Sequence, residues 1–490
     1  MLKMSINKST LGGDAVRLTI SKVITLCITM VTTMLLSRFR TLEEYGTYSQ
    51  ILMTINLFAS IFMLGLPNSV NYFLGKENNY EERKKFLSVY YSVTTILSIL
   101  LGLALVCAVP LIEEYFKNSE IHCFIYFLAI YPWANIISSS IENVLVVYQK
   151  TTFLMIYRFI NSFFLLGSVV VVQIVGLGFK EYMVCNLVVY SLFAVSVYYI
   201  SFKLSGGIKI IFDKKLIKDI LFFSIPLGFA SIIGTLSLEL DKLLIGRLLN
   251  TSELAVYTNS AKELPVTIVA SSITAVLLPR LASMLKDNKR EEAIVLWNTA
   301  TELAFIVIAV IVSGVFTYAN EVMELLYSSK YLSGVPVFRV YTLVLVLRVT
   351  YFGIVLNALG KTKEIMYCSI GALVLNAILN PLFYLIMGII GPAVATFVSI
   401  FFISMLQLYL TSKSIGIMVK KIFPWVHFLQ IVVINFALGI VFFFLKKWLS
   451  IDLVVGDVVE SLALGVLWSS IYFLFMKSRI IELWNTLNTK

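Results

Sequence analysis

The chain has 490 residues, of which 59% are hydrophobic and only 14% are charged, and its mean hydropathy is +0.91. Soluble domains carry about 25% charged residues, so this composition excludes a soluble globular enzyme. The net charge of +11 would favour nucleic acid as a partner in a soluble protein. Here Lys and Arg collect in alternate loops between apolar segments, which is the pattern of a membrane protein and excludes that partner.

Apolar stretches of about 20 residues recur along the whole chain, and each can cross a hydrocarbon core of about 30 Å. Their length and continuous apolarity favour helices over barrel strands. The first stretch lacks a small-residue cleavage site, so we expect a retained helix and not a signal peptide. We predict an all-α polytopic membrane protein with 14 transmembrane helices, at about 14–37, 46–74, 86–111, 121–148, 153–176, 180–202, 216–240, 254–283, 293–317, 333–359, 363–387, 389–412, 423–445 and 457–476.

The orientation follows from the distribution of basic residues. If the N-terminus is cytoplasmic, 27 of the 39 Lys and Arg residues fall in inside segments, from Lys3 and Lys8 to Lys477, Arg479 and Lys490. The outside loops hold only nine. The positive-inside rule therefore predicts that both termini are cytoplasmic, which also requires an even number of spans.

A spaced pattern in the first half recurs in the second half. Three residues with the same internal spacing return about 209 positions later: Arg38, Glu44 and Tyr48 as Arg247, Glu253 and Tyr257. Two further anchors keep the same order: Lys150–Thr151 with Lys361–Thr362, and Gly178 with Gly391. Because equivalent positions lie six spans apart, we predict two parallel six-helix lobes, related by a pseudo-twofold axis along the membrane normal. The lobes are 1–205 and 206–415, and 416–490 adds two helices and a cytoplasmic tail.

Charged residues inside the spans are the first candidates for a binding site, because each costs about 2.5–3.5 kcal/mol at the centre of a helix. Arg348 lies near the middle of the tenth predicted span and is the strongest candidate to face a substrate path. Arg339 lies nearer the outer end of the same span. It can reach the interface by extending along the helix.

Three more basic residues are candidates. Lys262 lies in the eighth span just before Pro265, where a bent helix carrying a cation would suit a gate. A local ion pair with Glu239, Asp241 or Glu302 is an equal alternative for the Lys262–Glu263 pair. Arg17 and Lys22 begin the first span, either as ordinary inside flanking residues or as the lining of an inward-open cavity.

Other polar residues have simpler interpretations. Glu142 and Arg158 are predicted to form a salt bridge, and Asp241 and Lys242 an interfacial pair. Glu44 and Glu253 are predicted to cap the helices that follow them. The two histidines, His122 and His427, are interfacial polar residues or members of a proton relay. Neither they nor the five scattered cysteines indicate a metal site.

Prolines mark candidate bends that would act as gates. They are Pro67 in the second span, Pro226 in the seventh, Pro265 in the eighth and Pro381, next to Asn376 and Asn380, in the eleventh. Such positions let helices bend during transport, and static packing kinks are the alternative.

An ordered set of short motifs resembles a known family. The motifs are Leu42-Glu-Glu-Tyr-Gly-Thr-Tyr48, Gly65-Leu-Pro-Asn-Ser69, Leu240-Asp-Lys-Leu-Leu-Ile-Gly246, Leu277-Leu-Pro-Arg-Leu281, Leu359-Gly-Lys-Thr-Lys363, Leu375-Asn-Ala-Ile-Leu-Asn380 and Gly388-Ile-Ile-Gly-Pro-Ala393. Over essentially the whole chain it resembles the Wzx-type polysaccharide flippases of the multidrug/oligosaccharidyl-lipid/polysaccharide exporter superfamily. The resemblance implies twelve core helices in two lobes and a central cationic cavity, with Arg17, Lys22 and Lys262 as positional matches.

The resemblance also implies the cargo. This is an undecaprenyl-diphosphate-linked oligosaccharide, moved from the inner to the outer leaflet of the bacterial cytoplasmic membrane for O-antigen or capsule synthesis. Expected partners are this lipid-linked oligosaccharide, membrane lipids, and a polysaccharide polymerase with a chain-length regulator. No cofactor is expected, and an ion gradient or the membrane potential would bias the cycle. Two alternatives stay open: an antiporter for drugs or small cations on the same fold, and a membrane polymerase or acyltransferase.

Overall fold

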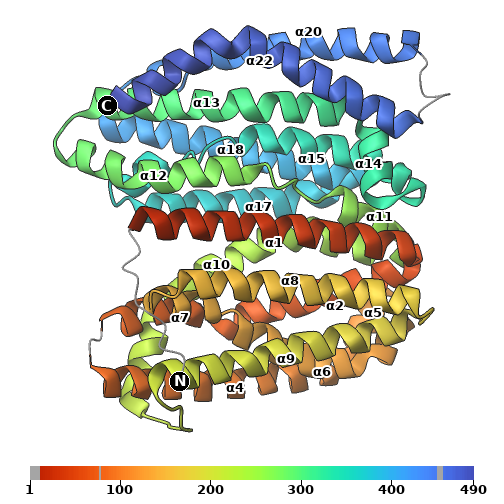
Figure 1. The fold of residues 1–490 in the computed structure, drawn as a ribbon, viewed down its shortest axis with the longest axis vertical. Coiled ribbons are helices and arrows are strands. Elements are labelled where there is room, and N and C mark those ends of the chain that lie inside the picture. The colour runs from red at the N-terminus through yellow and green to blue at the C-terminus, as the bar shows by residue number, and fades with distance from the viewer. Residues whose placement is uncertain (1–10, 77–78, 450–455, 490) are drawn as a thin grey trace. The chain divides into compact units, whose positions relative to one another are not determined.

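The computed structural model describes residues 11–76, 79–449 and 456–489, and every regular element in them is helical (Figure 1). Lys3, Lys8 and Lys490, which entered the orientation argument, lie outside the described residues. The chain forms two compact units. The first consists of residues 1–239 and 246–255, and the second of residues 240–245 and 256–490. The boundaries of the lobes at 205 and 415 stay a prediction.

The first unit holds the helices up to the start of the second half. They are α1 (Leu11–Phe39), α2 (Leu42–Met63), α3 (Leu66–Ser69), η1 (Val70–Leu74), α4 (Tyr80–Cys107), α5 (Val109–Phe116), η2 (Ser119–Phe124), α6 (Ile125–Ser138), α7 (Ile141–Val147), α8 (Thr151–Ile174), α9 (Phe179–Ser205) and most of α10 (Lys214–Leu248). Helix α1 packs along α8, and α6 packs against both α4 and α9.

The second unit takes the short segment 240–245 of α10 and the rest of the chain. Its helices are the end of α11 (Thr251–Ser260), α12 (Thr267–Lys286), α13 (Arg290–Thr317), α14 (Ala319–Tyr327), η3 (Ser329–Gly334), α15 (Val335–Leu347), α16 (Ile354–Ala358), α17 (Thr362–Met387), η4 (Gly388–Ile390), α18 (Gly391–Ile415), α19 (Val419–Ile422), α20 (Trp425–Leu449) and α22 (Asp457–Thr489). Helix α13 is central, since α12, α15, α20 and α22 all pack against it.

The helices suit a membrane in length and in surface. Among the described residues, 11 helical segments are long and apolar enough to cross a bilayer, and the number is 12 if the bent pair α2 and α3–η1 forms one span. Large apolar side chains also stand exposed, for example Phe222 at 82% and Leu385 at 81%. Such a surface is unfavourable in water and is stable against lipid chains. The chain is therefore an all-α, multi-pass membrane protein.

The count differs from the predicted fourteen at three places. The segment Thr362–Ile415 enters the count once, although it contains two helices, α17 and α18, joined by η4. The predicted eighth span, 254–283, is interrupted between α11 and α12 and does not qualify as one apolar helix. The second span is bent by 46°.

The tenth predicted span, 333–359, is wrong in its C-terminal half. The helical segment ends at Leu347, and residues 348–353 are irregular before α16 begins. Trp297, which is fully buried, donates a hydrogen bond of 2.9 Å from its indole nitrogen to the Thr350 hydroxyl. This tertiary contact with α13 holds the irregular segment, and no local sequence pattern reveals it.

The repeat seen in the sequence reappears as equivalent elements. Helices α4 and α13 both have 28 residues, and each is followed by a short helix, a 3-10 turn and the next long helix. Helices α8 and α17 both begin after a lysine, and the residue before each lysine, Gln149 or Gly360, has a positive φ.

The repeated glutamates cap helices, as predicted. The Thr41 hydroxyl accepts from the Glu44 backbone N–H at 3.2 Å, and the Glu44 carboxylate accepts from the Thr41 N–H at 3.0 Å. Asn250 and Glu253 make the same reciprocal pair at the start of α11. A carboxylate suits this position because the first backbone N–H groups of a helix have no partner within the helix.

The segment between α9 and α10 is fixed by Asp213. Its carboxylate accepts from the backbone N–H groups of Lys215 and Leu216, both at 3.0 Å, and lies 2.7 Å from the Lys85 ammonium. The Lys85 hydrogen bond, followed by the Leu216 N–H, lowers the pKa of Asp213 from 3.8 to about 2.

We predict an acid-dependent loss of stability at Asp213. Because the folded-state pKa is depressed, the ionised carboxylate stabilises the fold above pH 3.8, and this stabilisation is lost as the pH falls toward about 2. Thermal unfolding in detergent should place wild type above Asp213→Asn at pH 6. The gap should close as the pH is lowered through that window. A gap that is constant with pH would contradict the assignment.

Candidate functional site

Arg348 lies at the end of a helix and not in the middle of one, which corrects the sequence-based placement. It follows the last residue of α15, with φ −95° and ψ 7°. Its Nε and Nη2 atoms both donate to Oε1 of Glu263, at 3.2 Å and 3.1 Å. The Arg348 side chain is 39% exposed and the Glu263 side chain 26%, so this ion pair is accessible from outside the packed helices.

Lys262 and Glu263 lie in the interruption between α11 and α12, residues 261–266, together with Pro265. The Lys262 ammonium donates to the Asn259 side-chain oxygen at 3.0 Å. Pro265 has no N–H to continue a helix, which is consistent with a break at this place. The carboxylate of Glu263, next to Lys262, pairs with Arg348.

Asp241 is held by two tyrosines, which sequence reasoning missed. Its Oδ2 accepts from the hydroxyl of Tyr257 at 2.8 Å and also from the hydroxyl of Tyr341. Asp241 is 2% exposed, so the predicted interfacial pairing with Lys242 does not describe it. Tyr257 is the tyrosine of the repeated Arg–Glu–Tyr pattern, and this repeated spacing is the sequence feature that could have drawn attention to it. The carboxylate links segment 240–245 of α10 to α11 and α15.

A second charged cluster lies in the first unit. Glu142 in the first turn of α7 pairs with Arg158 of α8, as predicted, and also with Lys22 of α1, at 3.4 Å. The side chains of Lys22 and Glu142 are 57% and 39% exposed, and that of Arg158 is 16% exposed. Arg17, one and a half turns before Lys22 on α1, is exposed.

The bend near Pro67 is tied to the same helix as Glu142. Leu64 and Gly65 both have positive φ, and α3 restarts at Leu66 with Pro67 in its first turn. The Asn143 amide donates to the Pro67 carbonyl at 2.7 Å and accepts from Asn71 at 3.0 Å. The Pro67 carbonyl also accepts from the Val70 backbone N–H, so Asn143 adds a tertiary hydrogen bond that ties the bend to α7.

The other two prolines lie inside continuous helices. Pro226 is in α10 and Pro381 is in α17. Beside Pro381, Asn380 donates to Asn376 at 3.1 Å, and Asn376 donates to Thr396 of α18 at 3.2 Å. A role in gating stays a prediction at all four prolines, of which Pro67 and Pro265 adjoin interruptions.

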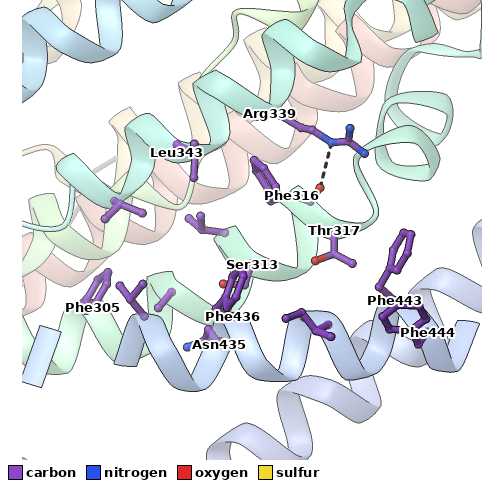
Figure 2. Close-up of a pocket in the computed structure, with 16 residues that line it drawn as sticks. Phe305, Ser313, Phe316, Thr317, Arg339, Leu343, Asn435, Phe436, Phe443 and Phe444 are labelled. Atoms are coloured by element: carbon purple, nitrogen blue, oxygen red, sulfur yellow. Dashed lines mark hydrogen bonds between the residues drawn. The ribbon is translucent and has the colours of Figure 1, made fainter. Parts of the chain in front are cut away.

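Arg339 lies apart from Arg348, at one end of an apolar groove of about 560 Å³ between α13, α15 and α20 (Figure 2). Its Nε donates to the Phe316 carbonyl at 3.3 Å, and its guanidinium lies 5.8 Å from the centre of the Phe316 ring. Aromatic and aliphatic side chains such as Phe305, Phe436 and Phe443 line the rest of the groove.

His427 belongs to a cluster on α13, α20 and α22. Buried Glu302 accepts from Arg479 through both carboxylate oxygens, at 2.7 Å and 2.9 Å, and His427 Nδ1 lies 3.3 Å from Glu302. Arg479 also pairs with Glu482 at 2.9 Å. This cluster joins the two added helices to α13. No group of three or more His, Cys, Asp or Glu residues among the described ranges could hold a metal ion.

Long apolar helices with a lipid-compatible surface define a polytopic membrane protein, and two groups of charged residues lie at interruptions of its helices. A family model described as "Polysaccharide biosynthesis protein" matches residues 35–336, and the chain belongs to this family. No curated protein matches the chain.

Solved structures identify the fold. The chain is similar to the lipid II flippase MurJ in an inward closed conformation, with 18% identity over 95% of this chain and 100% of that chain, and a TM-score of 0.75. It is also similar to an inward-facing multidrug resistance MATE family transporter of the MOP superfamily, with 15% identity over 82% of this chain and 98% of that one, and a TM-score of 0.63.

A third similar structure is a MOP superfamily transporter from Pyrococcus furiosus, whose description notes a reversed polarity of the binding pocket. Its identity is 15% over 82% of this chain and 96% of that chain, with a TM-score of 0.55. At these identities the likeness establishes the fold alone. The family match confirms the sequence-based resemblance to a family of polysaccharide biosynthesis, and the solved structures share the fold of this chain.

Proposed function

We propose that this protein moves undecaprenyl-diphosphate-linked oligosaccharides from the inner to the outer leaflet of the bacterial cytoplasmic membrane. The family match supports a role in polysaccharide biosynthesis. The observation that carries the proposal is the position of Arg348 at a helix interruption of a membrane-spanning segment, with its guanidinium partly exposed.

Physical chemistry connects this site to the cargo. A diphosphate carries negative charge that hydrocarbon cannot solvate, and guanidinium groups replace its lost hydration with charge-assisted hydrogen bonds. Arg348, Lys262, Lys22 and Arg17 are the proposed cations, and Arg339 is a weaker candidate because it lies at the apolar groove. No phosphate-donating nucleotide is needed, and an ion gradient or the membrane potential biases the cycle.

The proposed topology has fourteen spans with both termini in the cytoplasm. It counts the bent α2–α3–η1 segment as one span and the interrupted α11–α12 segment as one span. It counts α17 and α18 as two spans. Two six-helix lobes, 1–205 and 206–415, carry transport by alternating access, and 416–490 adds the last two spans. Interruptions near Pro67 and Pro265 supply bends for this change. A polymerase and a chain-length regulator are proposed partners.

Antiport of cationic drugs is the second candidate. Asp241 favours it, because a buried carboxylate is the group that a cationic substrate would seek. Two tyrosine hydroxyls already donate to this carboxylate. The ion-pair clusters of Glu142 and Glu263 hold three basic residues, Lys22, Arg158 and Arg348, against these two carboxylates. The lipid-diphosphate cargo is therefore preferred.

Deletion of the gene in its host tests the proposal. We expect surface polysaccharide to disappear and lipid-linked repeat units to accumulate on the cytoplasmic side, with both effects reversed by the wild-type gene. Repeat units are measured by mass spectrometry of extracted lipids, and drug susceptibility is measured in parallel. Unchanged polysaccharide together with increased drug susceptibility would replace this proposal with the antiport alternative.

A further inference from the structure

In each unit a carboxylate pairs with a cation that is proposed to contact the cargo. In the second unit Glu263 pairs with Arg348. In the first unit Glu142 pairs with Lys22 and Arg158. Glu142 gives one oxygen to each cation, Oε1 to Lys22 and Oε2 to Arg158, so each of these cations is held by a single oxygen, as Arg348 is by Oε1 of Glu263.

The geometry of the Glu263 pair differs from that of a structural ion pair. The Nε and Nη2 atoms of Arg348 donate to the same oxygen of Glu263, Oε1. By contrast, Arg479 reaches both oxygens of Glu302, whose side chain is only 5% exposed. Two parallel bonds to two oxygens make a strong, specific pair. A pair that uses one oxygen and is partly exposed is weak and exchangeable.

Both carboxylates lie at or beside breaks between helices. Glu263 lies in the non-helical segment 261–266, and Arg348 lies at the end of α15. Glu142 is in the first turn of α7, directly after the turn at residues 139–140. A small change in these segments separates the charges without unwinding a long helix.

We propose that Glu263 and Glu142 are internal counter-anions, which neutralise the cations when the transporter is empty and are displaced by the diphosphate of the cargo. This inference rests on the proposed function. A phosphate offers several acceptor oxygens to the planar guanidinium and displaces a carboxylate held by one oxygen. After transport the carboxylate recaptures its cation, which lowers affinity for the diphosphate and favours release.

Binding to the purified full-length protein in detergent tests this inference. The probe is undecaprenyl diphosphate, measured by native mass spectrometry, with the uncharged alcohol undecaprenol for comparison. Glu263→Gln keeps the shape and removes the competing charge, so we expect the diphosphate to bind about tenfold more tightly. Glu142→Gln should tighten binding as well. Glu292→Gln changes an exposed carboxylate of α13 and should leave binding unchanged.

The outcomes separate the inference from the proposed function. If Glu263→Gln and Glu142→Gln bind the diphosphate no better than wild type, while Arg348→Gln loses binding, the carboxylates only position the cations and the inference is overturned. If wild type binds the diphosphate no more tightly than the alcohol, and Arg348→Gln binds the diphosphate as wild type does, the proposed function itself fails. In cells, tighter binding should accompany less surface polysaccharide, because release is slowed.

Discussion

Replacement of Arg348 by Ala is expected to abolish surface polysaccharide in the deletion strain while the protein still inserts into the membrane. The change removes a partly exposed guanidinium at the end of α15 and shortens no helix. Truncating a residue that binds a charged group costs about 2–5 kcal/mol of binding, since the anion is left unpaired in a medium of low dielectric. A loss of this size corresponds to a reduction of at least about thirtyfold.

The comparison variants make the Arg348 result specific. Arg348→Lys keeps the charge but loses the planar donor pair, so we expect intermediate polysaccharide levels. Lys286→Ala removes an exposed cation at the end of α12 and should resemble wild type. Membrane levels are checked by immunoblot, and surface polymer by gel electrophoresis of extracted polysaccharide. Normal polymer with Arg348→Ala would exclude Arg348 from the transport path.

Replacement of Glu302 by Ala is expected to reduce stability by about 3 kcal/mol, the lower end of the effect of breaking a buried ion pair. Glu302 is 5% exposed and accepts two bonds from Arg479, whose side chain is 30% exposed. The variant leaves the arginine without its buried partner and removes a polar link between α22 and α13. Thermal unfolding in detergent measures the change.

The second partner of Arg479 provides the matched control. Glu482 is 64% exposed and lies one turn from Arg479 on the same helix. Glu482→Ala should change stability by less than about 1 kcal/mol, as exposed pairs do. Equal effects of the two variants would show that burial does not determine the strength of this cluster.

Local sequence patterns predicted the features that depend on a few neighbouring residues. Apolar length indicated the membrane helices, because the bilayer imposes it on each segment separately. Glu44 and Glu253 were predicted as caps from their position before a helix, and both cap one. The pair Glu142 and Arg158 also followed from two consecutive spans. Interruptions near Pro67 and Pro265 follow from the missing N–H of proline.

Other features depend on partners far apart in the chain. Arg348 pairs with Glu263, 85 positions away, and Asp241 accepts from Tyr341, 100 positions away. Glu302 and Arg479 are 177 positions apart. Just after the end of α15, the Thr350 hydroxyl accepts from Trp297 of another helix, 53 positions away.

The sequence by itself determined the membrane class, the caps, the duplicated order of elements and the family resemblance, because these are set by composition and by contacts within a few residues. Only the tertiary structure decided which carboxylates pair with Arg348 and Arg479 and where the tenth span ends. The physical reason is that a charge in an apolar medium must find a partner, and the chain offers many partners of equal chemistry. Packing of the helices selects one of them by bringing it within about 3 Å.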